Sequence, residues 1–351
     1  MKTILEVLHD LRESDPPLEY LRPGESVALG KFTEFELVKW NGSVRFVPSE
    51  ALNLPGRPGH RSFLYRGQTK HYPNCQSSLL RNAPNDEWQI KALLSLERFR
   101  VTELELVLRK HPFKLVAERH GFSVDYHGLA QHYGIPTSLL DLTSNVEVAA
   151  FFAVAHWDKA SRAFVPMESG VGVIYRLDWC EFGPGYSKFF EPVGFGPGLR
   201  PARQHAWTFR LRPGVDFHNV PHVKVIEFEH TKLASESLFT RFDNGTWLYP
   251  PDCLANLVEK LSGLPLVTME AIRHAARQDG QPHEALEAAS ERAARFIHEK
   301  LGLEIVDGYE LQPEEDDLDD AKTQAPELDR ALNAMSKGWR LVRFRPEESP
   351  E

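Results

Sequence analysis

An arginine followed by a glycine, Arg66-Gly67, ends a short run of apolar and aromatic residues that begins at Phe63. The guanidinium group of arginine is a permanent, planar cation that can hold a phosphate through two parallel hydrogen bonds. Glycine lets a ligand or another backbone approach closely. The pair predicts one wall of a polar pocket for a phosphate-bearing ligand. The alternative is a structural arginine that pairs with a core carboxylate such as Asp141.

A second polar cluster spans residues 131–144, directly before an apolar segment that is predicted to be a buried helix. Its candidate site residues carry ionisable, aromatic or hydroxyl groups: His132, Tyr133, Asp141, Thr143 and Ser144. Burying so many hydrogen-bonding groups is costly unless they bond to one another or to a ligand. A histidine here could act as a general acid or base near neutral pH, or it could be structural. The two hydroxyl residues could equally end a strand or cap the helix.

These clusters resemble the FRG domain, which is named for its Phe-Arg-Gly residues. Residues 131–143 read Gln-His-Tyr-Gly-Ile-Pro-Thr-Ser-Leu-Leu-Asp-Leu-Thr, and residues 149–153 read Ala-Ala-Phe-Phe-Ala. The likeness covers residues 32–262. Ser138 and Leu142 depart from it, because the family usually has Arg and Trp there.

The order of three segments also resembles the ADP-ribosyltransferase fold: Arg66-Gly67, then Thr143-Ser144 before an Ala- and Phe-rich helix, then Gln204 after a long loop. This resemblance implies NAD as cosubstrate. Arg66 would hold its diphosphate or adenosine ribose, and Gly67 would let the nicotinamide amide reach the backbone.

The same resemblance implies that Thr143 and Ser144 hold the ribose and orient the arginine. Tyr133 or Phe151 would then face the nicotinamide ring, although Phe151 is equally typical of a core residue.

The third segment carries Gln204 where the resemblance implies a carboxylate. Cleavage of the glycosidic bond of NAD develops positive charge on the ribose, and a carboxylate stabilises that charge better than an amide does. Asp141 is the stronger substitute and Glu236 the weaker one. We therefore expect Gln204, Asp141 and His132 to be the catalytic candidates, or the chain to be a binder.

The predicted function is that of an NAD-dependent ADP-ribosyltransferase or NAD glycohydrolase. Its acceptor would be a macromolecule, either protein or nucleic acid, and the resemblance suggests an effector or defence toxin. Two alternatives stay open: a noncatalytic nucleotide-sensing or partner-binding module, and a phosphodiesterase that uses its histidines.

The secondary-structure elements that must position these residues indicate an α+β fold. Its sheet would be split, mostly antiparallel and ADP-ribosyltransferase-like, with packed helices. Strands are predicted for residues 62–67, around 139–140, and for 170–177, 205–211 and 223–229, besides a hairpin over 34–47 that turns at Asn41-Gly42. Helices are predicted for residues 3–12, 86–111, 122–132, 146–156 and 250–261, besides one that ends at Gly302. The glycine-rich loop over 183–201 is expected to contact a ligand or partner.

Three regions follow from these elements: residues 1–31 as an N-terminal helix and link, 32–262 as the FRG domain, and 263–351 as an α-rich appendage. The appendage is expected to end with a strand near 339–344. The acidic run over 314–320 is predicted to be a solvated linker, with a regulatory partner-binding segment as the alternative.

Composition excludes several classes of function. The net charge of −9 argues against electrostatic binding of nucleic acid, and the three cysteines lack the spacing of a metal site. The N-terminus has no apolar signal region, and no stretch approaches the roughly 20 apolar residues of a membrane span. We therefore expect a cytoplasmic protein without a metal or a membrane partner.

Overall fold

The computed structural model of the chain describes residues 1–14, 27–28, 34–40, 43–48, 63–84, 86–181, 189–194, 196–250, 253–308, 315–335 and 342–343. The α-helices of these residues are α1 Ile4–Ser14, α2 Glu87–Val107, α3 Pro112–Arg119, α4 Tyr126–Tyr133, α5 Val146–Val154, α6 Arg200–Arg203, α7 Lys232–Arg241, α8 Cys253–Gly263, α9 Met269–Gln278, α10 His283–Leu301 and α11 Glu315–Met335. Short 3-10 helices lie at Leu108–Lys110, Trp179–Glu181, Phe217–Asn219 and Asp243–Gly245.

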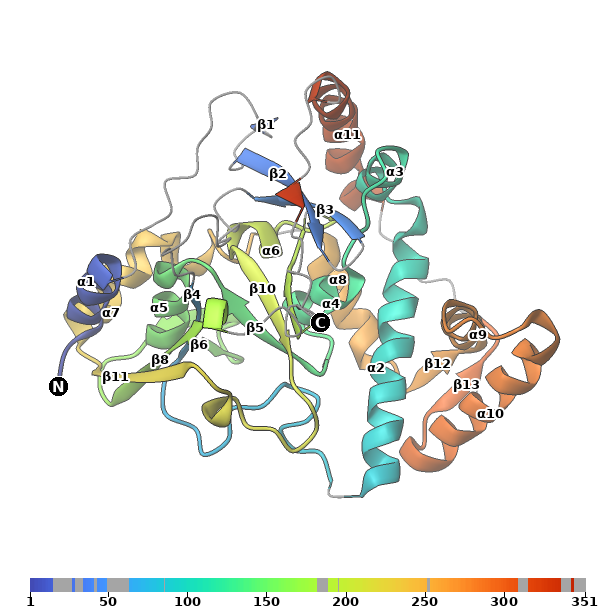
Figure 1. The fold of residues 1–351 in the computed structure, drawn as a ribbon, viewed down its shortest axis with the longest axis horizontal. Helices are drawn as coiled ribbons and strands as arrows, with labels where there is room; N and C mark the ends of the chain where they lie inside the picture. The colour runs from blue at the N-terminus through green and yellow to red at the C-terminus, as the bar shows by residue number, and fades with distance from the viewer. Residues whose placement is uncertain are drawn as a thin grey trace, which may run out of the picture.

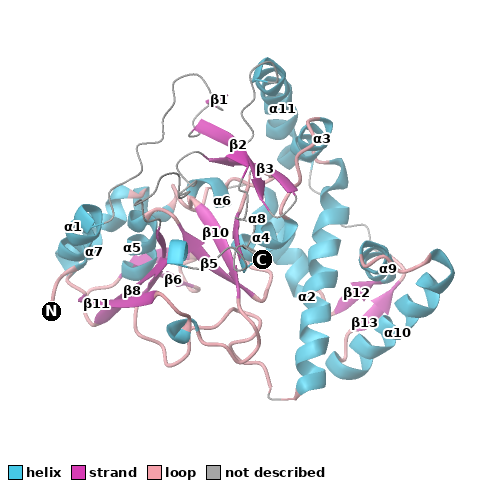
Figure 2. Ribbon diagram, in the orientation of Figure 1, coloured by secondary structure: helices cyan, strands magenta, loops and turns pink. Residues whose placement is uncertain are grey.

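The strands are β1 Val27–Ala28, β2 Glu34–Trp40, β3 Ser43–Pro48, β4 Phe63–Gln68, β5 Leu139–Thr143, β6 Ala155–Asp158, β7 Ala163–Pro166, β8 Val171–Asp178, β9 Phe190–Pro192, β10 Ala206–Arg210, β11 Val223–Glu229, β12 Leu266–Thr268, β13 Glu304–Val306 and β14 Val342–Arg343. Six of them form the central sheet, in the order β11-β8-β4-β5-β10-β9, and all neighbouring pairs are antiparallel (Figures 1 and 2). The predicted α+β class with a mostly antiparallel sheet is confirmed.

The middle of this sheet is weakly joined. Strands β4 and β5 share a single registered pair, Tyr65↔Thr143, whereas β4 pairs with β8 along its whole length. The inner edges of β4 and β5 are therefore open to side chains beyond that pair.

Side chains alternate along each strand, and each face of the sheet packs against a hydrophobic core. Phe63 and Tyr65 of β4 join the core formed with α1, α5 and α7, and Leu64 joins the opposite core with Tyr175 and Trp207. Helix α5 is apolar nearly all round, as predicted, and it lies directly on β4. The first helix belongs to the same core.

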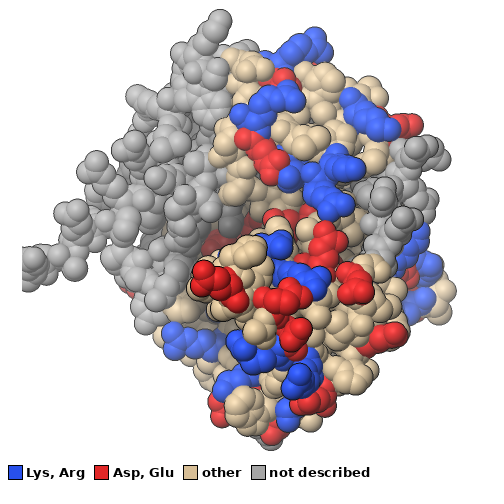
Figure 3. Space-filling model, turned by 90° about the vertical axis from the view of Figure 1, so that its right-hand side faces the viewer, with Lys and Arg blue, Asp and Glu red and all other residues tan. Residues whose placement is uncertain are grey.

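The long helix α2 joins the sheet region to a C-terminal unit made of α9, α10, β12 and β13 (Figure 1). The side chain of Asp86 accepts a hydrogen bond from the Gln89 backbone N–H and caps α2. As predicted, α10 ends at Gly302, which has a positive φ of 68°. Figure 3 shows Lys and Arg side chains interspersed with Asp and Glu on the face where this unit lies.

Two predicted boundaries need correction. The helix predicted from residue 122 begins at Tyr126, because Asp125 accepts a hydrogen bond from the Gly128 N–H and caps it there. The helix predicted to reach residue 156 ends at Val154, where β6 begins. Helix α3 was not predicted. In the glycine-rich loop, residues 182–188 and 195 lie outside the described residues, as does the Asn41-Gly42 turn of the β2–β3 hairpin.

The acidic run was wrongly predicted to be a linker. From Glu315 onwards it forms the first turns of α11. Ala321, Ala325, Leu328 and Leu332 recur at helical spacing and pack against α3. Packing of this apolar stripe against α3 stabilises the helix despite the negative charge of its first turns. No helix in the described segments is long and apolar enough to cross a membrane.

Candidate functional site

A cavity of about 340 Å³ opens beside the weak junction of the sheet. Its lining residues are Tyr65, Arg66, Gly67, Gln131, His132, Tyr133, Gly134, Asp141, Leu142, Thr143, Ala149, Phe152, Arg200, Gln204 and Tyr249. Seven of the eight predicted site residues are among them, and Ser144 is the exception. The cavity therefore joins the two polar clusters that the sequence singled out.

Arg66 lies where β4 and β5 separate. A continued antiparallel register would place Gly67 opposite Asp141. Instead, Arg66 Nη1 donates a hydrogen bond of 2.8 Å to the Asp141 carbonyl oxygen. The predicted structural alternative, a pair with the Asp141 carboxylate, is thus replaced by a contact with its backbone. Arg66 Nε is buried and has no hydrogen-bond partner among the described residues.

Two glutamines hold the ionisable side chains of the cavity. Gln131 Nε2 donates to Asp141 Oδ2 over 3.1 Å, and Gln204 Oε1 lies 2.9 Å from His132 Nδ1. The other end of the Gln204 amide, Nε2, donates to the Leu248 carbonyl oxygen over 3.0 Å. Gln204 is only 4% exposed, so both ends of its amide are engaged within the protein.

Asp141 and His132 face each other across this arrangement. His132 Nε2 lies 3.6 Å from Asp141 Oδ1, and within the described structure neither buried atom has a hydrogen-bond partner. The Asp141 side chain is 40% exposed, against 3% for that of His132. Asp141 is therefore the carboxylate that the cavity presents.

Aromatic rings and a second arginine form the opposite wall. The Arg200 guanidinium lies 4.5 Å from the ring centre of Tyr133 and 4.9 Å from that of Tyr249, a favourable cation–π arrangement. Burial, followed by the charge of Asp141, raises the pKa of Tyr249 to about 12. The Tyr249 hydroxyl thus remains neutral at physiological pH and can donate a hydrogen bond.

Other predicted residues have visible structural roles. Thr143 Oγ1 donates to the Gln204 carbonyl oxygen over 2.7 Å, and Asn145, rather than Thr143 or Ser144, caps α5. Phe151 is fully buried in the core and does not line the cavity; Phe152 does.

Gly67 is required by packing. A Cβ atom at this position would lie 1.8 Å from the Ala149 carbonyl oxygen of α5. Of the two neighbours that the sequence allowed at this glycine, a ligand or another backbone, the backbone of α5 makes the close approach.

Sequence reasoning did not identify Gln131, Phe152, Arg200 and Tyr249 as site residues. Arg200 lies near the end of the glycine-rich loop over 183–201, and the expectation that this loop contacts a ligand was the sequence signal for it. Glu236, the weaker substitute carboxylate, lies on α7 beside Lys232 and outside the cavity lining.

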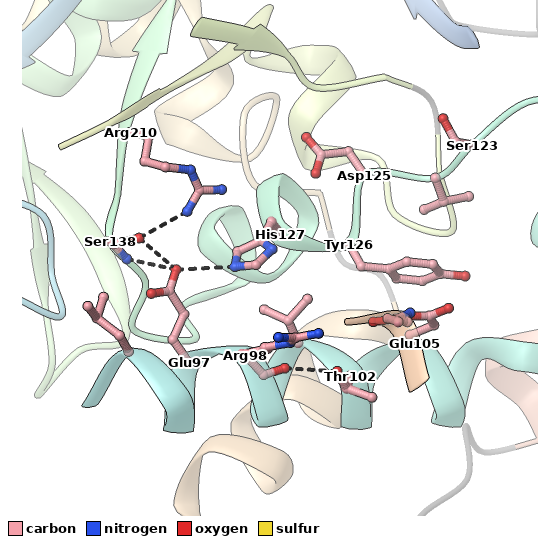
Figure 4. A pocket seen from close by; sticks show the side chains of 14 residues that line it. Glu97, Arg98, Thr102, Glu105, Ser123, Asp125, Tyr126, His127, Ser138 and Arg210 are labelled. Atoms are coloured by element: carbon pink, nitrogen blue, oxygen red, sulfur yellow. Dashed lines mark hydrogen bonds and ion pairs between the residues drawn. The ribbon is translucent and has the colours of Figure 1, made fainter. Parts of the chain in front are cut away.

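A second cavity, of about 430 Å³, lies between α2 and the start of α4 (Figure 4). Glu97 Oε1 accepts hydrogen bonds from the Ser138 N–H (2.9 Å) and Oγ (3.0 Å), and His127 Nε2 lies 3.3 Å away. Arg210 Nη1 donates to Ser138 Oγ over 3.3 Å. Burial raises the pKa of Tyr126, whose hydroxyl has no partner among the described residues.

The two cavities differ in how their polar groups are satisfied. In the second cavity, the central groups bond to one another. In the first, buried polar atoms of Arg66, His132, Asp141 and Arg200 lack partners within the described residues. Buried polar atoms without partners are rare in proteins and point to a ligand or water, so we place the candidate site in the first cavity. The described residues contain no group of three or more His, Cys, Asp or Glu side chains that could hold a metal ion.

Comparison with known proteins gives one match. No curated protein and no solved structure matches the chain. Residues 61–162 match the model of the FRG domain family, a segment that runs from β4 through α5 and supplies Arg66, His132 and Asp141. This part of the chain is therefore similar to the FRG domain.

Proposed function

We propose that the chain is a cytoplasmic NAD-dependent ADP-ribosyltransferase or NAD glycohydrolase that acts on a macromolecular acceptor, as an effector or defence toxin would. The observation that supports this proposal is the Asp141 carboxylate, which faces a cavity that is also lined by two arginines and by four Phe and Tyr side chains. Such a combination suits a ligand with phosphates, a ribose and a flat ring.

The lining fits NAD by its chemistry. The Arg66 Nε and Arg200 Nε donors lack protein partners among the described residues and would hold phosphate oxygens. The aromatic side chains that line the cavity, such as Tyr133 and Phe152, would contact the nicotinamide ring. NAD supplies a glycosidic bond whose cleavage develops positive charge on the ribose.

Asp141 is better placed than Gln204 to stabilise that charge. Its carboxylate is partly exposed and oriented by Gln131. The Gln204 amide is neutral, and the protein engages both of its ends. Fixed charges aimed at developing charge provide the largest single contribution to many enzymatic rates.

The test is to follow nicotinamide release and transfer of label from labelled NAD. Asp141→Asn should lower the rate on the order of 100- to 1000-fold while calorimetry still detects NAD binding. Glu236→Gln is the matched control and should behave as wild type. Absence of both turnover and NAD binding in wild type would reject the proposal, and loss of turnover only in Glu236→Gln would move the role to that carboxylate.

A second candidate is a noncatalytic nucleotide-binding module. The observation that favours it is the neutral Gln204 in place of a carboxylate. In that case, wild type would bind ADP-ribose and NAD by calorimetry without releasing nicotinamide, and Asp141→Asn would bind NAD at least as well.

A further inference from the structure

The orientation of the Gln204 amide determines which nitrogen of His132 carries a proton. The Leu248 carbonyl oxygen can only accept a hydrogen bond, so the Gln204 atom beside it must be the donor Nε2. Gln204 Oε1 then faces His132 Nδ1 and can only accept. His132 Nδ1 must therefore carry a proton.

This tautomer leaves His132 Nε2 as a proton acceptor. In neutral His132 of this tautomer, Nε2 is an acceptor that lies 3.6 Å from Asp141 Oδ1, another acceptor, and no hydrogen bond joins the two atoms. The two atoms repel each other unless a proton is placed between them. Asp141 cannot turn away freely, because Gln131 Nε2 binds its Oδ2 and Thr137 in turn donates to Gln131. The pair is thus built to receive one proton.

We propose that Gln204 is a positioning residue that holds His132 in the Nδ1–H tautomer, so that the Asp141–His132 pair receives the proton lost by the attacking group of the acceptor. The inference rests on the proposed function and narrows its acceptor to a group that must give up a proton, such as the hydroxyl of water or of a macromolecule.

The step balances without another reactant. The bond from the ribose to nicotinamide breaks, and its electron pair leaves with nicotinamide. The acceptor oxygen bonds to the same ribose carbon. Its proton passes to Asp141, the exposed member, and is held at His132 Nε2, which leaves an imidazolium beside an ionised carboxylate.

The variants separate positioning from simple packing. Gln204→Leu removes both hydrogen bonds of the amide and permits the other tautomer, in which Nε2–H donates to Asp141 Oδ1. Gln204→Glu loses the bond to Leu248 but keeps an acceptor for Nδ1–H. A purely structural role of the Leu248 contact predicts equal damage from both variants. A positioning role predicts that Gln204→Glu rescues the tautomer.

Nitrogen-15 NMR of the histidine rings reads the tautomer without any substrate. We expect a protonated Nδ1 on His132 in wild type and in Gln204→Glu, and a shift to Nε2–H in Gln204→Leu. The fold of each variant is verified by its amide spectrum. Thr208→Val, a buried change on β10 outside the cavity, is the matched control and should leave the His132 signals unchanged. A wild-type signal from the Nε2–H tautomer, or a Gln204→Leu signal identical to wild type, would overturn the proposal.

Turnover provides the second readout. Gln204→Leu should lower kcat on the order of 10- to 100-fold, the usual cost of removing a group that orients a reacting side chain, and should change the pH profile while the Kd for NAD stays constant. Gln204→Glu should recover part of kcat. If wild type does not turn over NAD, the proposed function and the proton-transfer role fail together, while the NMR result still decides the tautomer assignment. A Gln204→Leu enzyme with a wild-type kcat and the shifted tautomer would reject the proton-transfer role alone.

Discussion

Arg66 has two tasks at the junction of β4 and β5. Its Nη1 satisfies the Asp141 carbonyl where the strand ladder stops, and its buried Nε has no hydrogen-bond partner among the described residues. The proposed ligand contact would therefore use a different atom of this side chain from the structural contact. A substitution must be assessed for both effects.

Arg66→Ala should weaken ADP binding about 10- to 100-fold, the value of one charge-assisted hydrogen bond. It should also lower the free energy of unfolding by about 1–3 kcal/mol, because the Asp141 carbonyl loses its donor. Calorimetry and urea denaturation measure the two effects separately. Arg210→Ala, in the second cavity, is the control. A loss of ADP affinity in Arg210→Ala alone would place the nucleotide in the second cavity.

His111 predicts a pH dependence of stability. Burial lowers its pKa to about 4, from an ordinary value of 6.5, and its Nδ1 accepts the Phe113 N–H that begins α3. Between these two values the unfolded chain binds a proton that the folded chain does not. The free energy of unfolding should therefore fall as the pH drops from 6.5 to 4, by up to about 3 kcal/mol.

The matched variant is His111→Asn, which keeps an acceptor for the Phe113 N–H but cannot titrate. Urea denaturation at pH 7 and at pH 4.5 should show a smaller loss for the variant than for wild type. Equal losses would show that His111 does not control this dependence.

At the scale of elements, the contact between β4 and α5 sets the floor of the cavity. The backbone of α5 lies directly over Gly67, and Phe152 of this helix lines the same cavity as Arg66. A helix that is displaced from the strand would widen the cavity floor.

Gly67→Ala should accordingly destabilise the fold by about 3 kcal/mol, at the upper end of overpacking effects, since the new methyl group meets backbone atoms that cannot rotate away. Gly263→Ala provides the comparison: this glycine ends α8, and nothing lies within 4 Å of an added Cβ. That change should be neutral or stabilise by up to about 1 kcal/mol. Equal melting temperatures for the two variants would contradict the packing argument.

Local sequence patterns predicted the elements in which apolar residues recur with one clear period, that of a strand or that of a helix. Strands β4, β8 and β11 follow runs of aromatic and β-branched residues, and α10 ends at the glycine that its pattern required. Helix α11 was missed because its first turns carry a dense negative charge, while its apolar stripe becomes clear only from Ala321 onwards.

The site was predicted in part for a similar reason. Arg66, His132 and Asp141 lie in dense motifs, so their chemistry is visible in the sequence. Arg200 and Tyr249 reach the cavity from distant segments, and only tertiary packing brings Arg200 against the rings of Tyr133 and Tyr249. The neighbour of Gly67 could not be assigned from sequence, because sequence does not specify whether a ligand or the backbone of α5 lies against this glycine.

At the scale of the whole molecule, α2 carries the contact between the sheet region and the C-terminal unit. Its apolar residues Ala92 and Phe99 pack with α9 and α10. Its buried polar side chains reach the segment around β12: Arg100 Nη2 donates to the Leu264 carbonyl oxygen, and Glu103 Oε1 accepts the Thr268 N–H over 2.9 Å. The unit is therefore fixed to the helix by specific bonds as well as by apolar area.

The Arg100–Glu103 pair should consequently couple the folding of the two parts. Its nitrogen–oxygen distance is 2.7 Å, and the side chains are 7% and 1% exposed. Burial raises the pKa of Glu103, and the neighbouring Arg100 opposes this effect. Glu103→Ala leaves a buried, unpaired arginine and an unbonded Thr268 N–H, so we expect a loss of about 3–5 kcal/mol in the free energy of unfolding.

Replacing both Arg100 and Glu103 separates the contribution of their ion pair from the cost of burying one unpaired charge. The double variant Arg100→Met with Glu103→Leu should recover most of the loss, because removing both charges also removes the unpaired one. Glu105→Ala, whose side chain is 29% exposed, should cost far less. Tryptophan fluorescence in urea should show one transition in wild type. Separate transitions in wild type, or a Glu103→Ala variant as stable as wild type, would show that the C-terminal unit folds independently of this pair.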